Sequence, residues 1–326
     1  MFFKRKRGAD TADTKIFFCT DVHGSTVCFK KFINAADFYG VKILILGGDT
    51  TGKMVVPVVK RNGGYTGSFA GKDVQLDTAT ELDDFTKRVA NMGFYPAVMD
   101  ESEMDTFRGD PGKQHDLFLK LIRARWEEWI EYAEKKLANS DVQVLAAPGN
   151  DDFFEVDEII ASSERIVLPE GRVHQLTEQH EIVTTGWTNR TPWNTERECD
   201  EDDLGRRLDE MIAGVKDLER CIFNIHVPPY NSKIDICAKL DADLKVVYDM
   251  GNPVQAPAGS TAVRAAFERY QPLLGLHGHI HEGKGQINIG RSLCLNPGSV
   301  YSEGVLNGAL VTLNDTGVKD VHFTQG

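Results

Sequence analysis

The chain has 326 residues, of which 41% are hydrophobic and 26% are charged, and its formal net charge at pH 7 is −12. This content suffices for one large α/β domain or two smaller ones, and no stretch approaches the roughly eighteen uninterrupted apolar residues of a transmembrane segment. The acidic balance argues against broad electrostatic binding to nucleic acid, which requires a basic face, so we expect no stable nucleic-acid binding.

The chain starts with a basic segment, M-F-F-K-R-K-R-G, which we interpret as part of a flexible tail over residues 1–14. No apolar stretch follows its basic residues, so the segment does not predict a secretory signal. The six cysteines are scattered without a C-x-x-C pair, a pattern typical of reduced, buried thiols. We therefore expect a cytoplasmic protein.

Five short apolar runs have the length of buried strands, and each ends at a turn signal or a histidine. In chain order they span residues 15–19, 41–46, 142–147, 221–225 and 273–276.

A helix is predicted between the first two runs, over residues 25–39, with Gly40 as its C-cap. The resulting strand–helix–strand unit predicts an α/β sheet. Polar residues of the kinds that bind metals follow the runs, at the carboxyl ends of strands, where open α/β sheets generally place their ligands.

Residues 53–140 differ from this pattern and are interpreted as an insertion in a single domain over residues 15–326. A hairpin is predicted at 54–69, a helix at 81–91, and an amphipathic helix at 117–137. We expect the hairpin to cap the site and the long helix to pack on the sheet.

Two later segments are predicted to be peripheral. Residues 196–210 are strongly charged and predict a loop that leads into a solvated helix ending near Lys216. A metal site is the alternative, but the segment lacks spaced histidines and flanking strands. Residues 231–259 read as a long loop, whose position suits either a lid on the substrate side or an ordinary variable surface.

Five short motifs contain the candidate functional residues. They are D-x-H at Asp21-Val22-His23, G-G-D at Gly47-Gly48-Asp49, G-N-D at Gly149-Asn150-Asp151, His226 before V-P-P, and G-H-x-H at Gly278-His279-Ile280-His281. Each motif is weak alone, but each follows a predicted strand, so all five are expected to converge at one edge of the fold.

The donor types indicate a metal site. On an extended segment, the two ends of D-x-H point to the same side and can reach one ion. The glycines that precede Asp49, Asn150 and His279 allow the backbone to approach the ions closely. Mixed imidazole, carboxylate and amide donors suit Mn, Fe, Zn, Ni or Co, and fit neither a thiolate zinc site nor an all-oxygen calcium site.

The ordered set of motifs resembles the calcineurin-like metallophosphoesterase family, and in particular the Icc-like predicted phosphoesterases of bacteria and archaea. The resemblance runs from Lys15 to about Val300 and includes the N-P-G-S at residues 296–299. It implies a four-layer αββα sandwich of two mixed β-sheets flanked by helices.

The resemblance also implies which residues would bind each ion of a two-metal centre. Asp21, His23 and His281 would hold the first metal, and Asn150, His226 and His279 the second. Asp49 would bridge both, with a shared hydroxide that attacks the phosphorus of a small phosphate ester, and manganese is the favoured metal. The residues assigned catalytic roles are Asp49, Asn150, Asp151 and His226.

The sequence departs from the family pattern at one position. Members that hydrolyse phosphomonoesters carry a histidine after the asparagine, where this chain has Asp151. An ionised aspartate is a poor proton donor and adds negative charge beside an anionic substrate. Asp151 could instead act as an acid with a raised pKa or orient a histidine ligand, and both alternatives remain open.

We therefore expect a phosphodiesterase. A phosphomonoesterase or a nuclease of the same superfamily is the first alternative, and a non-catalytic metal-binding scaffold is the second. Competent donors at all seven ligand positions argue against the scaffold.

Overall fold

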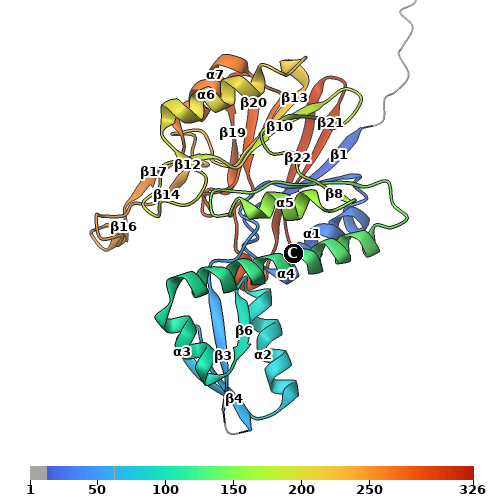
Figure 1. The fold of residues 1–326 in the computed structure, drawn as a ribbon. Coiled ribbons are helices and arrows are strands. Elements are labelled where there is room, and N and C mark those ends of the chain that lie inside the picture. Colours follow the sequence, from blue (N-terminus) through green and yellow to red (C-terminus); the bar gives the residue numbers. More distant parts are fainter. Residues whose placement is uncertain (1–12, 62) are drawn as a thin grey trace, which may run out of the picture.

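Two mixed β-sheets lie face to face in the computed structural model, which describes residues 13–61 and 63–326 (Figure 1). Within these residues the first sheet has six strands in the order β22-β21-β1-β2-β7-β8, and the second has six in the order β19-β20-β18-β13-β10-β9. The strands of the first sheet are β1 (Thr14–Cys19), β2 (Ile43–Leu46), β7 (Gln143–Ala146), β8 (Ile166–Val167), β21 (Asn307–Asn314) and β22 (Gly317–Gln325). The strands of the second are β9 (Val173–Gln175), β10 (Glu181–Thr185), β13 (Cys221–Ile225), β18 (Leu274–Leu276), β19 (Gly285–Ile289) and β20 (Ser292–Asn296).

The central strands of each sheet are parallel. Strands β1, β2, β7 and β8 run in one direction in the first sheet, and β10, β13, β18 and β20 do so in the second. The antiparallel strands lie toward the edges. Because parallel strands end at the same edge of a sheet, the loops after β1, β2, β7, β13 and β18 can meet.

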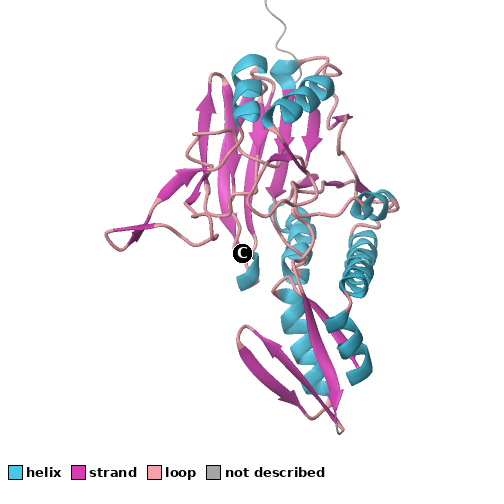
Figure 2. Ribbon diagram, turned by 60° about the vertical axis from the view of Figure 1, so that its left-hand side comes forward, coloured by secondary structure: helices cyan, strands magenta, loops and turns pink. Residues whose placement is uncertain are grey.

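Helices cover the outer faces of both sheets. On the first sheet lie α1 (Thr26–Tyr39), α4 (Pro111–Lys136) and α5 (Glu155–Ala161), and on the second lie α6 (Glu201–Ile212) and α7 (Thr261–Tyr270). Figure 2 shows the sheets and their helices from a second side. The structure therefore has the four-layer αββα architecture with two mixed sheets that the resemblance implied.

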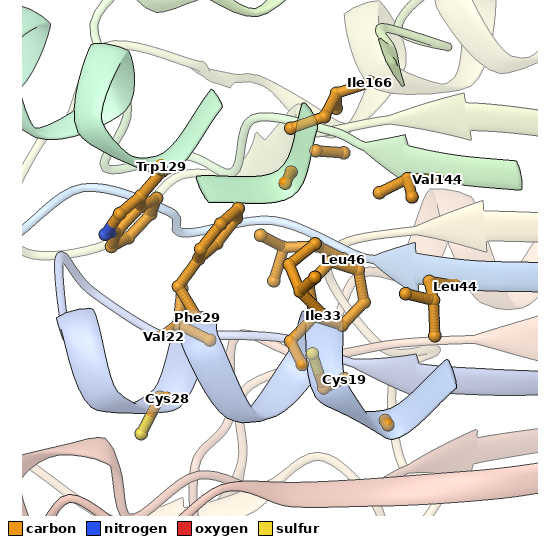
Figure 3. Packing of buried hydrophobic residues seen from close by; sticks show 14 of the residues in the cluster. Cys19, Val22, Cys28, Phe29, Ile33, Leu44, Leu46, Trp129, Val144 and Ile166 are labelled. Carbon is orange, nitrogen blue, oxygen red and sulfur yellow. The ribbon is translucent and has the colours of Figure 1, made fainter. Parts of the chain in front are cut away.

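Both faces of the central strands are buried, which explains why the strands read as continuous apolar runs. In β1, Ile16 and Phe18 belong to the core between the sheets, whereas Phe17 and Cys19 face the helical layer. In that layer the ring of Phe29 on α1 stacks on Trp129 of α4, with centroids 4.3 Å apart (Figure 3). Burial in both directions fixes the register of the strand.

The helix predicted over residues 25–39 is confirmed. It begins at Thr26 because Ser25 is its N-cap and accepts a hydrogen bond from the amide of Cys28, and Gly40 ends it with φ 63°. The strands predicted by the apolar runs agree with β1, β2, β7, β13 and β18 to within two residues at either end.

A second sheet system projects from the sandwich over residues 55–109, which we call the lobe (Figures 1 and 2). Its sheet has the order β5-β4-β3-β6, with α2 on one face and α3 on the other. The elements are β3 (Val55–Arg61), β4 (Gly64–Phe69), β5 (Lys72–Leu76), α2 (Ala79–Asn91), β6 (Tyr95–Met99) and α3 (Glu101–Gly109). The hairpin predicted at 54–69 is confirmed, but its sheet packs against the lobe's own helices.

The prediction of an insertion at 53–140 in a single domain stays a prediction, and residues 1–12 of the predicted tail lie outside the described residues.

Helix α4 joins the lobe to the sandwich. Leu117 and Leu121 near its start pack in the lobe, and Trp126 and Trp129 pack against the first sheet's helical layer. Midway, the buried guanidinium of Arg125 donates hydrogen bonds to the carbonyls of Gly24 and Ala90, the latter at 3.4 Å. The sequence predicted a helix from residue 117, but α4 begins at Pro111 because Asp110 caps it.

The peripheral segments contain short structured pieces. Residues 231–259 form a projecting arm of two small hairpins in place of the expected loop, and α6 ends at Ile212, short of the expected residue 216. The arm contains β14 (Ile236–Ala238), β17 (Gln255–Pro257), β15 (Tyr248–Asp249) and β16 (Asn252–Pro253), and a separate pair is β11 (Thr188–Asn189) with β12 (Glu198–Cys199). Among the described residues, no helix is both long and apolar enough to cross a membrane.

Candidate metal centre

The seven predicted ligands come from the loops that follow β1, β2, β7, β13 and β18, and the structure brings all of them together. Asp21 and His23 follow β1, Asp49 follows β2, and Asn150 follows β7. His226 directly follows β13, and the two histidines of the G-H-x-H motif follow β18. The convergence at one edge that the sequence predicts is therefore present.

The first cluster contains Asp21, His23 and His281, which each place one ligand atom within 4.8 Å of the others. The Nε2 atoms of His23 and His281 are 3.1 Å apart, and His281 Nε2 lies 3.3 Å from Asp21 Oδ1. Three donor atoms that face one point in this way could coordinate one metal ion.

The second cluster contains Asp49, His226 and His279, with the same mutual limit of 4.8 Å. His226 Nε2 lies 3.3 Å from Asp49 Oδ2, and His279 Nδ1 lies 2.8 Å from Asn150 Oδ1. The amide oxygen of Asn150 thus joins this cluster, while its Nδ2 donates to Thr195 Oγ1 at 2.8 Å.

The carboxylate of Asp49 lies between the two clusters. Its Oδ2 is 3.3 Å from His226 Nε2 in the second cluster and 3.6 Å from His23 Nε2 in the first. The clusters are also linked by the backbone amide of His279, which donates to the carboxylate of Asp21 at 3.1 Å, and by the 3.8 Å distance from His226 Nε2 to Asp21 Oδ1. Asp49 therefore occupies the position that a bridging ligand requires.

Four of the ligands have backbone φ angles in the left-handed region. The values are 53° for Asp21, 40° for His23, 48° for Asp49 and 65° for His279. Such conformations cost non-glycine residues about 1–2 kcal/mol each and are found where the surrounding structure enforces them. The expectation that Asp21 and His23 share an extended segment is wrong: a strained turn, and not strand alternation, aims both side chains at one point.

The glycines of the motifs permit close approach between the backbone and the carboxylates of the centre, while the predicted approach to the ions stays a prediction. A Cβ on Gly149 would lie 2.1 Å from Asp49 Oδ1, and one on Gly278 would lie 2.4 Å from Asp21 Oδ2. The backbones of two motifs therefore touch the carboxylates of two others, and no side chain fits between them.

Backbone carbonyls fix the orientation of two histidines. His23 Nδ1 lies 3.3 Å from the carbonyl of Thr51, and His226 Nδ1 lies 3.2 Å from the carbonyl of Gly47. Because a carbonyl only accepts hydrogen bonds, each ring carries its proton on Nδ1. The lone pair on each Nε2 then points into the site.

The fit to a cation is clearest at His226. Its Nε2 is buried and makes no hydrogen bond, yet it faces the carboxylates of Asp49 and Asp21. Burial lowers the pKa of His226, but the charges of these carboxylates outweigh it and raise the pKa to about 10. A site that holds a proton this tightly between two carboxylates is one that a divalent cation can fill.

Two other imidazoles, those of His23 and His279, favour the neutral form that binds metals. Burial also opposes protonation of His281, but the hydrogen bond and the charge of Asp21 outweigh burial and raise the pKa of His281. Burial lowers the pKa of His23 to about 3 and that of His279 to about 4. Burial opposes ionisation of Asp21, but the hydrogen bond from His281 and the charge of His226 lower its pKa to about 2. The centre thus combines the two neutral imidazoles of His23 and His279 with the ionised carboxylate of Asp21.

Asp152, which the sequence analysis did not single out, anchors two ligand loops. Its carboxylate accepts hydrogen bonds from the amides of Thr50 at 2.9 Å, Thr51 at 2.7 Å and Gly149 at 2.8 Å. It ties the loop after β2 to the loop after β7 and so positions Asp49 relative to Asn150. Its place directly after the G-N-D motif was the available signal.

Asp151 faces the first cluster without orienting a histidine in it. Its Oδ2 is 3.9 Å from His23 Nδ1, too far for a hydrogen bond, and the carbonyl of Thr51 takes the role of orienting partner. Its Oδ2 instead pairs with Lys53 Nζ at 2.9 Å. Burial and the charge of Asp49 raise the pKa of Asp151 to about 6, against the opposing effect of Lys53.

Two further residues near the centre escaped the sequence analysis. Lys53 lies four residues after Asp49, and the ring of Tyr301 lies 4.6 Å from that of His23, centroid to centroid. A basic residue just beyond the G-G-D motif is a weak signal for the first. For Tyr301, its place directly after N-P-G-S-V was the only hint.

Comparison with known proteins gives one relative by sequence and several by fold. No protein-family model matches the chain. The uncharacterized protein MJ1162 of Methanocaldococcus jannaschii is 33% identical over 171 residues, which cover 52% of this chain and 70% of that protein.

Among solved structures, TT1561 of Thermus thermophilus is similar with a TM-score of 0.52 and 14% identity, covering 97% of this chain and 99% of that one. YfcE from E. coli, described as a phosphoesterase, covers 95% of this chain and 98% of its own at 11% identity, but its TM-score is 0.32. The chain belongs to the same family as the Methanocaldococcus jannaschii protein, and its two-sheet architecture is similar to that of TT1561.

Proposed function

We propose that this protein is a dinuclear metal-dependent phosphoesterase that favours small phosphodiesters. The observation that supports it most directly is the pair of adjacent donor clusters with the carboxylate of Asp49 between them. Asp21, His23 and His281 would hold the first ion, and Asn150, His226 and His279 the second. Neutral imidazoles with carboxylates and one amide suit borderline divalent metals, of which we favour manganese.

Two bound ions about 3.5–4 Å apart would polarise the phosphoryl oxygens and activate water for in-line attack. The protein's part is to hold the donors in place. The Nδ1–H groups of His23 and His226 are fixed by carbonyls, and the strained turns are enforced by the packing of the sheets. Preorganisation of this kind is a main source of catalytic power in charged sites.

The preference for diesters rests on Asp151. At neutral pH this carboxyl, with a pKa of about 6 and an ammonium partner, is mostly ionised and cannot readily protonate a leaving group. Diesters with good leaving groups need that proton less than monoesters do. The resemblance points the same way, because relatives without the histidine tend toward phosphodiesters.

Two measurements test the proposal together. The purified protein should bind about two manganese ions per chain, and the loaded protein should cleave bis(p-nitrophenyl) phosphate faster than p-nitrophenyl phosphate. Asp49→Asn should abolish the cleavage, because it removes one of the bridging oxygens. Asp202→Asn, on the exposed face of α6, is the matched control and should change nothing.

The outcomes separate the alternatives. Faster turnover of the monoester would identify a phosphomonoesterase, and cleavage confined to nucleic acid would identify a nuclease. Binding of two ions without any hydrolysis would identify a scaffold. Full activity of Asp49→Asn would remove Asp49 from the bridging role.

A further inference from the structure

A positive charge stands at the open side of the metal centre, on Lys53. The side chains of Asp49 and His226 are 4% and 0% exposed, whereas those of Asp151, His281 and Lys53 are 19%, 29% and 52% exposed. Exposure therefore rises from the bridging carboxylate toward Lys53. A substrate that approaches from solvent arrives on this side.

The ammonium is held close to the bridging residue. Lys53 Nζ lies 2.9 Å from Asp151 Oδ2, and the backbone amide of Asp151 donates to Asp49 Oδ1 at 3.1 Å. The half-exposed lysine thus stands at the rim of the centre, one residue away from the carboxylate of Asp49.

The same geometry argues against a third metal ion. His23, Asp49 and Asp151 also form a group of donors within 4.8 Å of one another. However, His23 Nδ1 already faces the carbonyl of Thr51, and Asp151 Oδ2 is occupied by Lys53. A third cation would have to displace both partners and lie beside an ammonium.

Charge accounting gives the lysine a role. Three carboxylates line the centre, from Asp21, Asp49 and Asp151. Two divalent ions together with the shared hydroxide would balance these carboxylates, and the ammonium of Lys53 would then leave one net positive charge. Arriving phosphate esters and departing phosphomonoesters carry one to two negative charges. The ammonium of Lys53 offsets the negative charge of Asp151, which would otherwise repel these anions.

We propose that Lys53 is the residue that binds the non-bridging oxygens of the substrate phosphate, in place of the cationic group that the family's histidine would provide, with Asp151 as its positioning residue. This inference rests on the proposed function. Lys53 acts as a hydrogen-bond donor and a fixed charge, and it transfers no proton. Its ligand is the phosphoryl group shared by diester substrates and monoester products.

The test measures binding of inorganic phosphate to the manganese-loaded protein by calorimetry. Lys53→Met should weaken phosphate about tenfold, equivalent to about 1.4 kcal/mol, and raise KM for bis(p-nitrophenyl) phosphate more than it lowers kcat. Lys53→Arg, which keeps the charge, should recover most of the affinity. Lys60→Met, on an exposed residue of β3, is the matched control and should bind phosphate normally.

Asp151 is tested as a positioning residue by a double variant. If Asp151 holds the ammonium in place, Lys53→Met should weaken phosphate binding much less in an Asp151→Asn background than in the parent protein. Equal losses in both backgrounds would show that the lysine acts without Asp151, and would overturn its positioning role.

The outcomes keep this inference distinct from the proposed function. Unchanged phosphate affinity in Lys53→Met, in a protein that hydrolyses diesters, would overturn the role of Lys53 alone. Lysine-dependent phosphate binding without hydrolysis would support the role and overturn the enzyme. Loss of manganese from both Lys53→Met and Lys53→Arg would show that the lysine maintains the site's structure and would overturn the inference, and a parent protein that binds neither manganese nor phosphate would overturn both.

Discussion

Replacement of Asp152 should both destabilise the protein and loosen the metal centre. The carboxylate is fully buried and accepts hydrogen bonds from three backbone amides. In Asp152→Ala all three amides lose their acceptor. Hydrogen bonds to charged groups contribute about 1.5–3 kcal/mol each, and a buried amide left unpaired costs about 1–3 kcal/mol.

The loss of stability in Asp152→Ala should be smaller than the summed contributions of these three hydrogen bonds. Burial and the nearby charge of Asp49 raise the pKa of Asp152, so the carboxylate is itself unfavourably placed. We therefore expect a loss of about 3 kcal/mol in Asp152→Ala. In Asp152→Asn one oxygen still accepts from Thr50 and Thr51, but the amide nitrogen faces the N–H of Gly149, and about 1.5 kcal/mol should be lost.

Urea unfolding in the presence of a chelator measures these differences without a contribution from bound metal. Metal titration of the same variants should show manganese affinity lowered about 10- to 100-fold, the usual effect of removing a group that positions ligands. Asp105→Asn, at an exposed position of α3, serves as the control and should leave both measurements unchanged. An Asp152→Ala protein within about 0.5 kcal/mol of the parent, with normal metal affinity, would refute the anchoring role.

Three further predictions follow from the site and its surroundings. Asp151→His should raise monoester turnover relative to diester turnover, and an unchanged ratio would contradict our interpretation of this position. Gly149→Ala should prevent metal binding, because its Cβ would lie 2.1 Å from Asp49 Oδ1, and a calorimetric titration that still shows two ions would exclude the clash. Burial, only partly offset by Arg197, raises the pKa of Glu170 to about 7 from 4.5, so the folded protein keeps this proton after the unfolded chain has lost it. The chelated protein should therefore lose about 1–3 kcal/mol of stability as pH rises from about 4.5 to about 7, and Glu170→Gln should lack this loss when thermal unfolding is compared at pH 5 and pH 8.

Much of the fold was predictable because its central strands are short apolar runs that end at turn residues. Because β1 and β2 are buried on both faces, their consecutive residues are apolar. The two strands are parallel, so their carboxyl ends lie together. Strand β6 was missed because Pro96 argues against a strand. The structure accommodates this proline at an edge of the lobe's sheet, where one missing amide is tolerated.

The residues that meet in the candidate centre were predictable from their types and order, but the reason they converge was not. Left-handed turns at Asp21, His23 and Asp49 are not encoded by the usual glycine signal, and the tertiary packing imposes them. Lys53 and Asp152 were missed because their importance depends on partners far away in sequence. Because nearly all residue types have a backbone amide, the amides that bind Asp152 cannot be recognised from the sequence.

The path of α4 has a consequence for how the lobe and the metal centre communicate. Arg125 contacts a carbonyl in the turn that contains His23 and another in α2 of the lobe. Gly93 of the lobe lies against the carbonyl of His23 so closely that a Cβ there would be 2.3 Å away. A molecule that binds the lobe and shifts α2 or Gly93 would therefore also shift the turn that contains His23.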